Sequence, residues 1–274
     1  MFAIKKNLVF YWLIEKLSLE GAAYVAAFLF GVVLCIVIPY LLGSLNASII
    51  ISKLFYHDDI RKYGSGNAGT TNMLRTYGKK PAAFTLLFDM LKGALSMVFG
   101  ILVFGNVAFG SIAGLFAVIG HMFPCFSHFK GGKGVATSAA VILMTNPIVF
   151  LILVAAFVII VVGTKMISLG SVMCVLLYPL ILFNFSVYKT WDVIVSFIIM
   201  GLVVFMHRAN IKRIWEGKES KISFKKHEKI PAAGAVAEEP AEAVTSKEEP
   251  IKKNAAPDKN TSKKKLKKQK KQGK

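Results

Sequence analysis

Three glycine-bearing polar stretches interrupt an otherwise apolar chain, and their residue types suit the binding of an anion. The first runs from Gly64 to Arg75 and is rich in Gly, Asn and Thr. Glycines let backbone N–H groups approach an anion, and the start of a helix favours negative charge. A dinucleotide-binding fingerprint is rejected, because it requires a buried strand before the glycines and the preceding residues are polar. We expect a phosphate-binding turn, with a flexible polar turn as the alternative, from Ser65, Gly66, Asn67, Thr71, Asn72 and Arg75.

The second stretch surrounds a lysine with glycines at the expected start of a helix. Lys133 follows Gly131 and Gly132 and precedes Gly134, and Lys130 stands just before them. Unhindered amides and a point charge at a helix start suit a phosphate group. The stretch is not a nucleotide-type P-loop, because the first glycine and the Ser or Thr after the lysine are missing. The alternative is an ordinary positively charged membrane anchor, which does not require three glycines around a lysine.

The third stretch begins at His207 and Arg208 and extends to Glu219. At helical spacing His207 and Asn210 share a face, and so do Asn210 and Arg213. Taken alone, this pattern is typical of the basic end of a last membrane helix. A smaller polar element, Ser168-Leu169-Gly170-Ser171, taken alone indicates a helix cap.

The elements that position these stretches are predicted to be membrane helices. Hydrophobic residues make up 55% of the 274 residues, more than the 45–50% that is typical of soluble domains. A membrane-spanning helix needs about 20 apolar residues. Seven apolar segments are present, the fourth of them short: Ala22–Phe55, which we expect to break near Pro39, Ala82–Phe104, Val107–Phe126, Val135–Met144, Ile148–Gly163, Leu169–Phe185 and Val193–Met206.

Basic residues set the expected orientation, since Lys and Arg collect in cytoplasmic loops. They occupy the loops after the first, third, fifth and seventh segments, while the alternate loops are nearly uncharged. We therefore predict an all-α polytopic membrane protein with seven transmembrane helices, an outside N-terminus and a cytoplasmic C-terminus. Its regions would be an N-terminal extension (1–21), a membrane domain (22–219) and a tail (220–274).

Asp89 and Lys92 lie three residues apart inside an apolar segment. Ionisable residues are costly there and are usually paired. We expect them to pair with each other, or Asp89 to pair with an arginine of the polar stretches. A direct catalytic role is the alternative.

The net charge of +19 is concentrated at the C-terminus, where the last 23 residues hold eleven lysines and one aspartate. Such a segment lacks the apolar area that ordering requires, so the tail is predicted to be disordered. Clustered lysines next to a cytoplasmic leaflet gain about 1 kcal/mol each from anionic lipid. RNA binding is allowed by the same charge, a solubilising extension is the plain alternative, and no specific nucleic-acid surface is indicated.

Taken together, four loops place glycines, cations and hydrogen-bonding side chains at one membrane face. They show no arrangement of a Ser-His-Asp or Cys-His nucleophile, and the sequence has no metal-ligand spacing and calls for no cofactor. The chemistry implied is the binding of phosphate-bearing molecules at the interface. Catalysis, transport of an organic phosphate, and anchoring of RNA or ribosomes through the tail all stay open at this point.

The ordered set G-S-G-N-x-G-x-T-N, G-H-x-x-P with F-K-G-G-K-G-V-A-T, S-L-x-S, and H-R-x-N-I-x-R with G-x-E resembles the PlsY-type acyltransferase family. The resemblance covers about Pro39 to Glu219. It implies transfer of a fatty acyl group from acyl phosphate to the 1-position of glycerol 3-phosphate. The products would be lysophosphatidic acid and phosphate, in the first acylation step of phospholipid synthesis at the cytoplasmic face of a bacterial membrane. It also implies an upstream enzyme that forms acyl phosphate.

Residue roles follow from the same resemblance. Contacts with glycerol 3-phosphate and phosphate would come from Ser65, Arg75, Lys133, Ser171, Asn210 and Glu219, with His207 close by. His207, Lys133 and Asn210 would be the catalytic residues, and Arg208 would be a further substrate contact. The amides of Gly131, Gly132 and Gly134 would hold the acyl phosphate. The H-x-x-x-x-D motif of the soluble-type acyltransferases is absent, because no histidine is followed five residues later by aspartate.

Overall fold

The computed structural model describes residues 9–185 and 189–222 of the chain. These residues belong to a compact unit that spans Met1–Val236, and a second unit, Ala237–Lys274, lies outside them. The described residues form helices and no strands, which confirms the all-α prediction. Residues 1–8 of the predicted extension and 223–274 of the predicted tail lie outside the described residues, so the three regional boundaries stay predictions.

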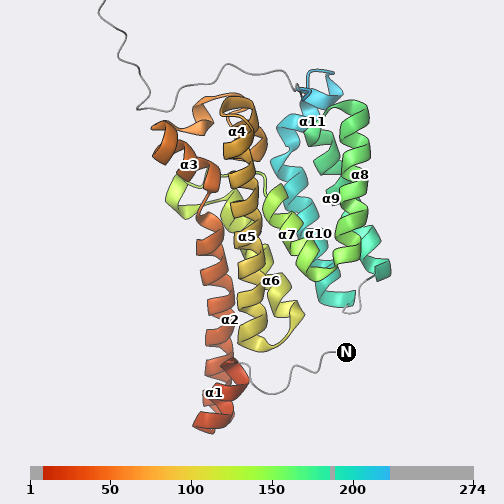
Figure 1. Ribbon diagram of the computed structural model, residues 1–274. Coiled ribbons are helices and arrows are strands. Elements are labelled where there is room, and N and C mark those ends of the chain that lie inside the picture. The colour runs from red at the N-terminus through yellow and green to blue at the C-terminus, as the bar shows by residue number, and fades with distance from the viewer. Residues whose placement is uncertain (1–8, 186–188, 223–274) are drawn as a thin grey trace, which may run out of the picture. The chain divides into compact units, whose positions relative to one another are not determined.

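The predicted apolar segments all form helices, and the first of them is divided in two (Figure 1). The helices that correspond to these segments are α2 (Gly21–Ser44) with α3 (Ala47–Tyr56), α5 (Lys79–Phe104), α6 (Val107–Met122), α7 (Val135–Thr145), α8 (Pro147–Thr164), α9 (Ile167–Phe185) and α10 (Lys189–Met206). Shorter elements surround them: α1 (Val9–Leu17), η1 (Ile60–Lys62), α4 (Thr70–Thr76), η2 (Cys125–Ser127) and α11 (Arg208–Trp215).

The break in the first segment lies beyond the predicted position. Pro39 is inside α2, and the helix continues through it to Ser44. A membrane helix tolerates an internal proline where its surroundings satisfy the freed backbone groups. The break falls at Leu45 and Asn46, where the Asn46 side chain accepts the backbone N–H of Ile49 at 3.3 Å and caps α3. A local capping residue, and not the proline, ends the first straight helix.

Within residues 9–185 and 189–222, five helical segments are long and apolar enough to cross a membrane, and α10 with α11, bent by 61°, adds a sixth candidate. Helix α7 has 11 residues, which is about 16 Å at 1.5 Å per residue. That length is roughly half of the ~30 Å hydrocarbon core. Seven full crossings and the orientation therefore stay predictions, while the short fourth helix itself is confirmed.

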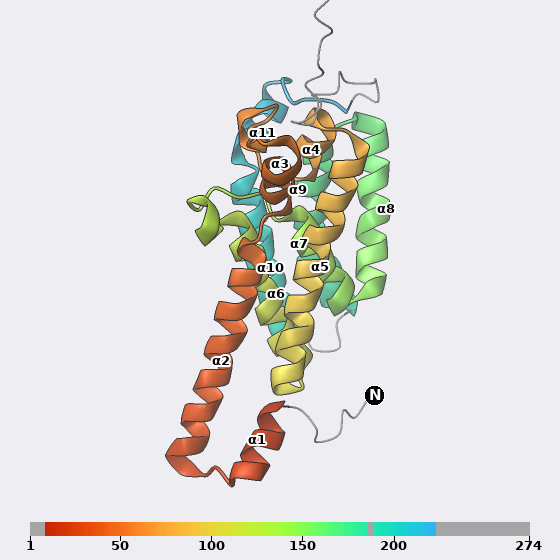
Figure 2. The same cartoon turned by 60° about the vertical axis from the view of Figure 1, so that its left-hand side comes forward.

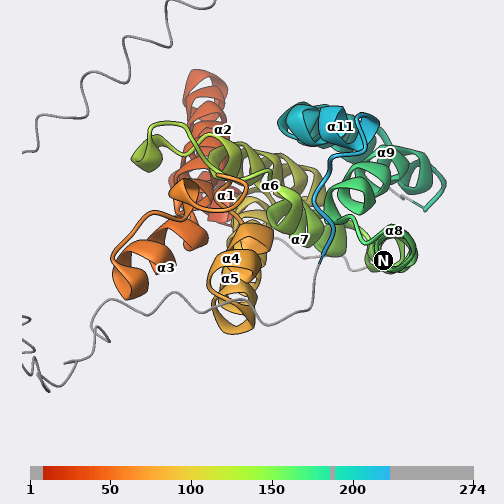
Figure 3. The ribbon, with the colours of Figure 1, turned by 90° about the horizontal axis from the view of Figure 1, so that it is seen from above.

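Helix α6 lies at the centre of the packing and contacts α2, α5, α7 and α10. The view from above shows α6 and α7 between α2 and the group of α8 and α9 (Figure 3). Large apolar side chains such as Phe30, Leu87, Leu151 and Ile159 point outward and are more than half exposed, at 64–72%. An apolar outer surface is what contact with lipid requires.

The polar elements lie at one end of these helices. Figures 1 and 2 show α3, α4 and α11 together at that end, with α1 and the start of α2 at the other. The first and third polar stretches, which α4 and α11 carry, therefore lie at the same end of the helices, although they are far apart in sequence.

Helices α2 and α6 approach closely at two glycines. A Cβ atom on Gly43 would overlap the backbone oxygen of Ala117, and one on Gly120 would overlap that of Tyr40. We predict that Gly43→Ala lowers the melting temperature of the detergent-purified protein by about 5 °C, since overpacking costs about 1–3 kcal/mol.

The matched control is Gly201→Ala in α10, where nothing lies within 4 Å of an added Cβ. Alanine is the better helix former by about 1 kcal/mol, so this control should be neutral or stabilising. A Gly43→Ala protein that melts as high as the Gly201→Ala protein would contradict the close α2–α6 contact.

Candidate functional site

A hydrogen-bonded network joins the second and third polar stretches. Lys133, between α6 and α7, places Nζ 2.5 Å from Oδ1 of Asn210 on α11. Asn210 Nδ2 donates to Oε1 of Glu219 and to Oγ of Ser168, both at 2.7 Å. Arg213 Nε donates to the other carboxylate oxygen of Glu219 at 2.8 Å. These five side chains are the Lys133–Asn210 network, and they come from three separate parts of the chain.

Local helix geometry explains how Glu219 reaches α11. Asn210 and Arg213 are three residues apart and share a face, as predicted. After α11, Gly217 adopts a left-handed conformation with φ +68°. Its N–H donates to Ile214 O, and the N–H of Lys218 donates to Arg213 O, which is the Schellman pattern that reverses a chain after a helix. The reversal returns Glu219 to the face that carries Asn210.

Burial and charge make the network a cationic site. Asn210 and Glu219 are only 4% and 8% exposed. Burial alone would raise the pKa of Glu219, but hydrogen bonds from Ser168, Asn210 and Arg213 outweigh it and hold the pKa below its usual value. Burial lowers the pKa of Lys133 to about 8, with Glu219 opposing that shift and Arg213 and Arg75 adding to it. Lys133 therefore interacts with two further cations and one carboxylate, and the excess positive charge favours an anionic ligand.

His207 lies buried between α10 and α11. Its Nδ1 is 2.8 Å from the backbone oxygen of Val203. A carbonyl oxygen only accepts hydrogen bonds, so Nδ1 carries a proton. Burial and the nearby charge of Lys133 lower the pKa of His207 to about 4, so the ring is neutral near pH 7 and Nε2 keeps its lone pair. His207 can therefore accept a proton at Nε2.

Asn72 organises the first polar stretch. Its side chain is buried and makes three hydrogen bonds: Oδ1 accepts the N–H of Ser65 at 3.0 Å, and Nδ2 donates to Ile60 O and Tyr63 O at 3.0 and 2.9 Å. Both N–H donors of Asn72 are used in these bonds and the side chain is 1% exposed, so its predicted contact with substrate stays a prediction. The structure instead uses Asn72 to hold the turn that exposes Ser65 and Gly66.

The remaining predicted residues of this stretch lie near that turn. Asn67 and Thr71 are partly buried. Arg75 extends from the last turn of α4, and its Nη2 donates to Ser220 O at 3.3 Å. Arg75 thus contacts the residue after Glu219, which connects the first stretch to the network.

The glycine amides of the second stretch are engaged within the protein. The N–H of Gly131 donates to Met122 O at 3.2 Å, and that of Gly132 donates to His121 O at 3.1 Å. They could bind a phosphate only if these bonds opened, so their proposed role stays a prediction. Gly134 begins α7 with φ +77°. The loop in this conformation presents the Lys133 side chain to the network.

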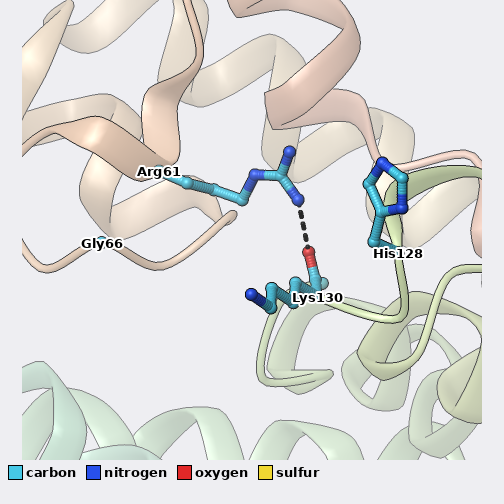
Figure 4. Close-up of a pocket in the computed structure, with 5 residues that line it drawn as sticks. Arg61, Gly66, His128 and Lys130 are labelled. Atoms are coloured by element: carbon cyan, nitrogen blue, oxygen red, sulfur yellow. Dashed lines mark hydrogen bonds between the residues drawn. The ribbon is translucent and has the colours of Figure 1, made fainter.

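A cavity of ≈ 470 Å³ is lined by Arg61, Gly66, His128, Lys130 and Gly131, none of which belongs to the network. Arg61 Nη1 donates to the backbone oxygen of Lys130 at 3.1 Å (Figure 4). It also donates to the backbone oxygen of Ser127 at 3.1 Å. Lys130 is three residues from Lys133, so their Cα atoms are at most ~11 Å apart. The predicted residues thus form two neighbouring groups, the cavity and the network.

Ser171 and Arg208 are among the predicted residues that belong to neither group. Ser171 Oγ donates to Ile167 O within α9 at 3.0 Å, and Ser168 makes the contact with Asn210 instead. Arg208 is exposed and lies over the Phe205 ring at 4.3 Å. Ser168 and Arg213 were absent from the predicted site, although the S-L-x-S element and the shared helical face pointed to them. No local sequence pattern predicted that Arg61 lines the cavity.

Comparisons with known proteins identify the family to which the chain is similar. Residues 33–217 match the family model described as glycerol-3-phosphate acyltransferase. The chain is 44% identical over 199 residues to the glycerol-3-phosphate acyltransferase of Macrococcus caseolyticus, which covers 71% of this chain and 99% of the relative. It is 42% identical over 193 residues to that of Bacillus subtilis, which covers 70% of this chain and 98% of the relative.

Two solved structures are also similar. Both are of PlsY (YgiH), described as an integral membrane glycerol 3-phosphate acyltransferase. The glycerol 3-phosphate form has a TM-score of 0.66 and 34% identity, and covers 70% of this chain and 96% of that chain. The lysophosphatidic acid form has a TM-score of 0.64 and 33% identity, and covers 70% of this chain and 95% of that chain.

The depressed pKa of Lys133 predicts how ligand binding depends on pH. The lysine is charged below about pH 8 and neutral above it. A phosphomonoester is fully ionised above about pH 7, so only the protein titrates in the range that matters. We predict that the affinity for glycerol 3-phosphate, measured by calorimetry, falls as pH rises from 8 to 10.

Lys133→Arg is the control, because arginine stays charged over the whole range. This variant should lose the decline between pH 8 and 10, whatever its absolute affinity. If Lys133→Arg shows the same decline as the parent protein, another group titrates and Lys133 does not hold the ligand.

Proposed function

The chain belongs to the glycerol-3-phosphate acyltransferase family, and from this premise we propose that it acylates the 1-hydroxyl of sn-glycerol 3-phosphate with an acyl phosphate. The products are 1-acyl-glycerol 3-phosphate and inorganic phosphate. The observation that carries the proposal is the Lys133–Asn210 network, a buried cationic site at the end of apolar helices. An acyl donor dissolved in the membrane and a phosphate-bearing acceptor from the cytosol could meet there.

The acceptor phosphate is bound by charge. Lys133 and Arg75 supply the cations, and the direct partner of Lys133 Nζ is the neutral Asn210 amide oxygen. The lysine charge is therefore not cancelled by a direct ion pair and remains available to a phosphate. Ser65 and the polar atoms of Ser168 and Glu219 are hydrogen-bonding partners for the glycerol hydroxyls.

The reaction requires orientation and charge stabilisation more than a protein nucleophile, because an acyl phosphate is already activated. The 1-hydroxyl oxygen of glycerol 3-phosphate attacks the acyl carbonyl carbon and forms the ester bond. The bond between that carbon and the phosphate oxygen breaks, and phosphate leaves with the electron pair. The hydroxyl proton passes to His207 Nε2 or to the departing phosphate, while Lys133 stabilises the charge that develops.

The donor and the location complete the proposal. Acyl-CoA and acyl carrier protein are not donors, and an enzyme that forms acyl phosphate must act upstream. The protein would be a multi-pass protein of the bacterial cell membrane with the site facing the cytoplasm, because the basic loops favour that side. The lysine-rich tail after Glu219, whose residues beyond 222 lie outside the described part, would contact anionic lipid of the same leaflet.

The test is an assay of the purified protein with glycerol 3-phosphate and each of three donors: acyl phosphate, acyl-CoA and acyl carrier protein. Acyl phosphate should give lysophosphatidic acid and inorganic phosphate in equal amounts, and the other two donors should give neither. Equal rates with acyl-CoA would overturn the donor assignment. An absence of product with every donor would overturn the activity itself.

Neighbouring variants show whether the activity belongs to this site. Arg213→Gln removes the charged hydrogen bond to Glu219, worth about 1.5–3 kcal/mol, and should lower kcat/KM about 10- to 100-fold. Lys212→Gln removes a side chain that is 78% exposed and should keep the parent rate. Near-normal turnover of His207→Asn would assign the proton to the departing phosphate.

A further inference from the structure

Three ionisable side chains are buried in the apolar helices next to the glycine stretch. Asp89 and Lys92 lie on α5 and are each 1% exposed, and His121 lies in the last turn of α6 and is 3% exposed. The predicted pairing is confirmed, since Lys92 Nζ is 2.9 Å from Asp89 Oδ1. Charged groups inside a membrane helix are costly and are retained where they serve a function. None of the three belongs to the Lys133–Asn210 network.

Three groups surround the ammonium group of Lys92, each 2.9 Å from Nζ. Nζ donates to Leu45 O, contacts His121 Nδ1 and forms an ion pair with Asp89 Oδ1. An ammonium group cannot accept a hydrogen bond, so Nδ1 of His121 is the acceptor. The imidazole proton therefore sits on Nε2, and the orientation of the ring is fixed by Lys92.

The other edge of the imidazole faces the glycine stretch. A Cβ atom on Gly132 would overlap His121 Nε2 and would lie 2.6 Å from the backbone oxygen of Ala68. The N–H of Gly132 also donates to the backbone oxygen of His121 at 3.1 Å. Both the ring and the backbone of His121 therefore set the position of Gly132, and Lys133 is the next residue.

The cluster is connected to the first polar stretch as well. Leu45 lies at the break between α2 and α3, and its carbonyl oxygen accepts from Lys92. The next residue, Asn46, donates from Nδ2 to Ala68 O at 3.4 Å. Ala68 is part of the Gly64–Arg75 stretch and touches the same face of Gly132. A shift of Lys92 would thus be transmitted to both polar stretches.

We propose that Asp89, Lys92 and His121 are positioning residues that fix Lys133 through Gly132. The chain of contacts runs from Asp89 to Lys92, to the ring of His121, and to the backbone of Gly132. Its effect is to hold the Lys133 side chain where it reaches Asn210. The claim that the cluster fixes the position of Lys133 is independent of the proposed function. The claim that the cluster affects turnover rests on the proposed function.

The position of residue 133 is tested without any activity measurement. Lys133→Cys is made with Cys35, Cys125 and Cys174 replaced by Ala, and the thiol introduced at position 133 is labelled with a water-soluble maleimide. Adding Asp89→Asn and Lys92→Met together removes the cluster without leaving an unpaired buried charge. The labelling rate should then change at least about fivefold, and an unchanged rate would overturn the proposal.

The matched control is Asp192→Asn, which alters another buried acid. Asp192 accepts from Ser111 Oγ at 2.9 Å, away from the glycine stretch, so the labelling rate should stay within about twofold. If the double variant does not purify as a folded protein, His121→Asn replaces it. Asparagine keeps an acceptor for Lys92 but lacks the atom that contacts Gly132, so the same change in labelling is expected.

A double-mutant cycle then tests whether the cluster acts through Lys133. The kcat/KM for glycerol 3-phosphate is measured for Lys133→Gln, for Asp89→Asn with Lys92→Met, and for all three changes together. If the cluster acts through Lys133, the triple variant stays within about twofold of Lys133→Gln. Losses that multiply would overturn the proposal. Where turnover is too slow to measure, the Kd of glycerol 3-phosphate serves in the same cycle.

The two failures are distinguishable. A Lys133→Gln protein as active as the parent would remove Lys133 from the proposed function, while the labelling experiment would still decide whether the cluster positions it.

Discussion

The contact between Lys133 and Asn210 joins two parts of the chain that are 77 residues apart, and the candidate site depends on it. An anion site beside a membrane needs cations that are held in place but not neutralised by their neighbours. Lys133 meets this requirement because its direct partner is an amide oxygen. The only carboxylate in the network is shared by Asn210 and Arg213. Asn210 thus holds the Lys133 side chain in place without neutralising it, and Arg213 pairs with the carboxylate of Glu219. The charge of Lys133 is left for a ligand.

Glycines give the fold the close approaches that this arrangement needs. Gly43 and Gly120 let α2 and α6 touch backbone to backbone, and Gly132 makes room for the His121 ring. Gly217 reverses the chain after α11 so that Glu219 returns to Asn210. Gly43 and Gly120 thus serve helix packing, Gly132 serves the placement of its loop, and Gly217 serves the assembly of the site. In this conformation the Gly-Gly-Lys-Gly stretch therefore serves the packing around His121, while phosphate binding by its amides stays a prediction.

Hydropathy predicted the helices well because transfer into lipid depends on local composition, which a sequence displays directly. The short α7 and the pairing of Asp89 with Lys92 followed from the same reasoning. The end of α2 was not predicted correctly. Pro39 is tolerated within α2, and the break falls at Asn46, which caps α3. Polar partners were predicted less well. Ser168 and Ser171 are one helical turn apart, and only the packing of α9 against α11 selects Ser168.

Contacts between distant segments were the hardest to foresee. Arg61 binds backbone oxygens 66 and 69 residues away, and no local pattern encodes such a pair. The Asn72 side chain was expected to face a ligand because asparagine suits that task, yet it satisfies three backbone groups of its own loop. Residue type therefore indicated the chemistry of the site, whereas the partner of each residue required the fold.

The most direct measurement of the central claim is an experimental structure of this protein with glycerol 3-phosphate bound. The account predicts a phosphate oxygen within about 3 Å of Lys133 Nζ, beside Asn210 and Arg75. A ligand whose phosphate sits in the cavity of Arg61 and Lys130 and makes no contact with Lys133 would contradict it.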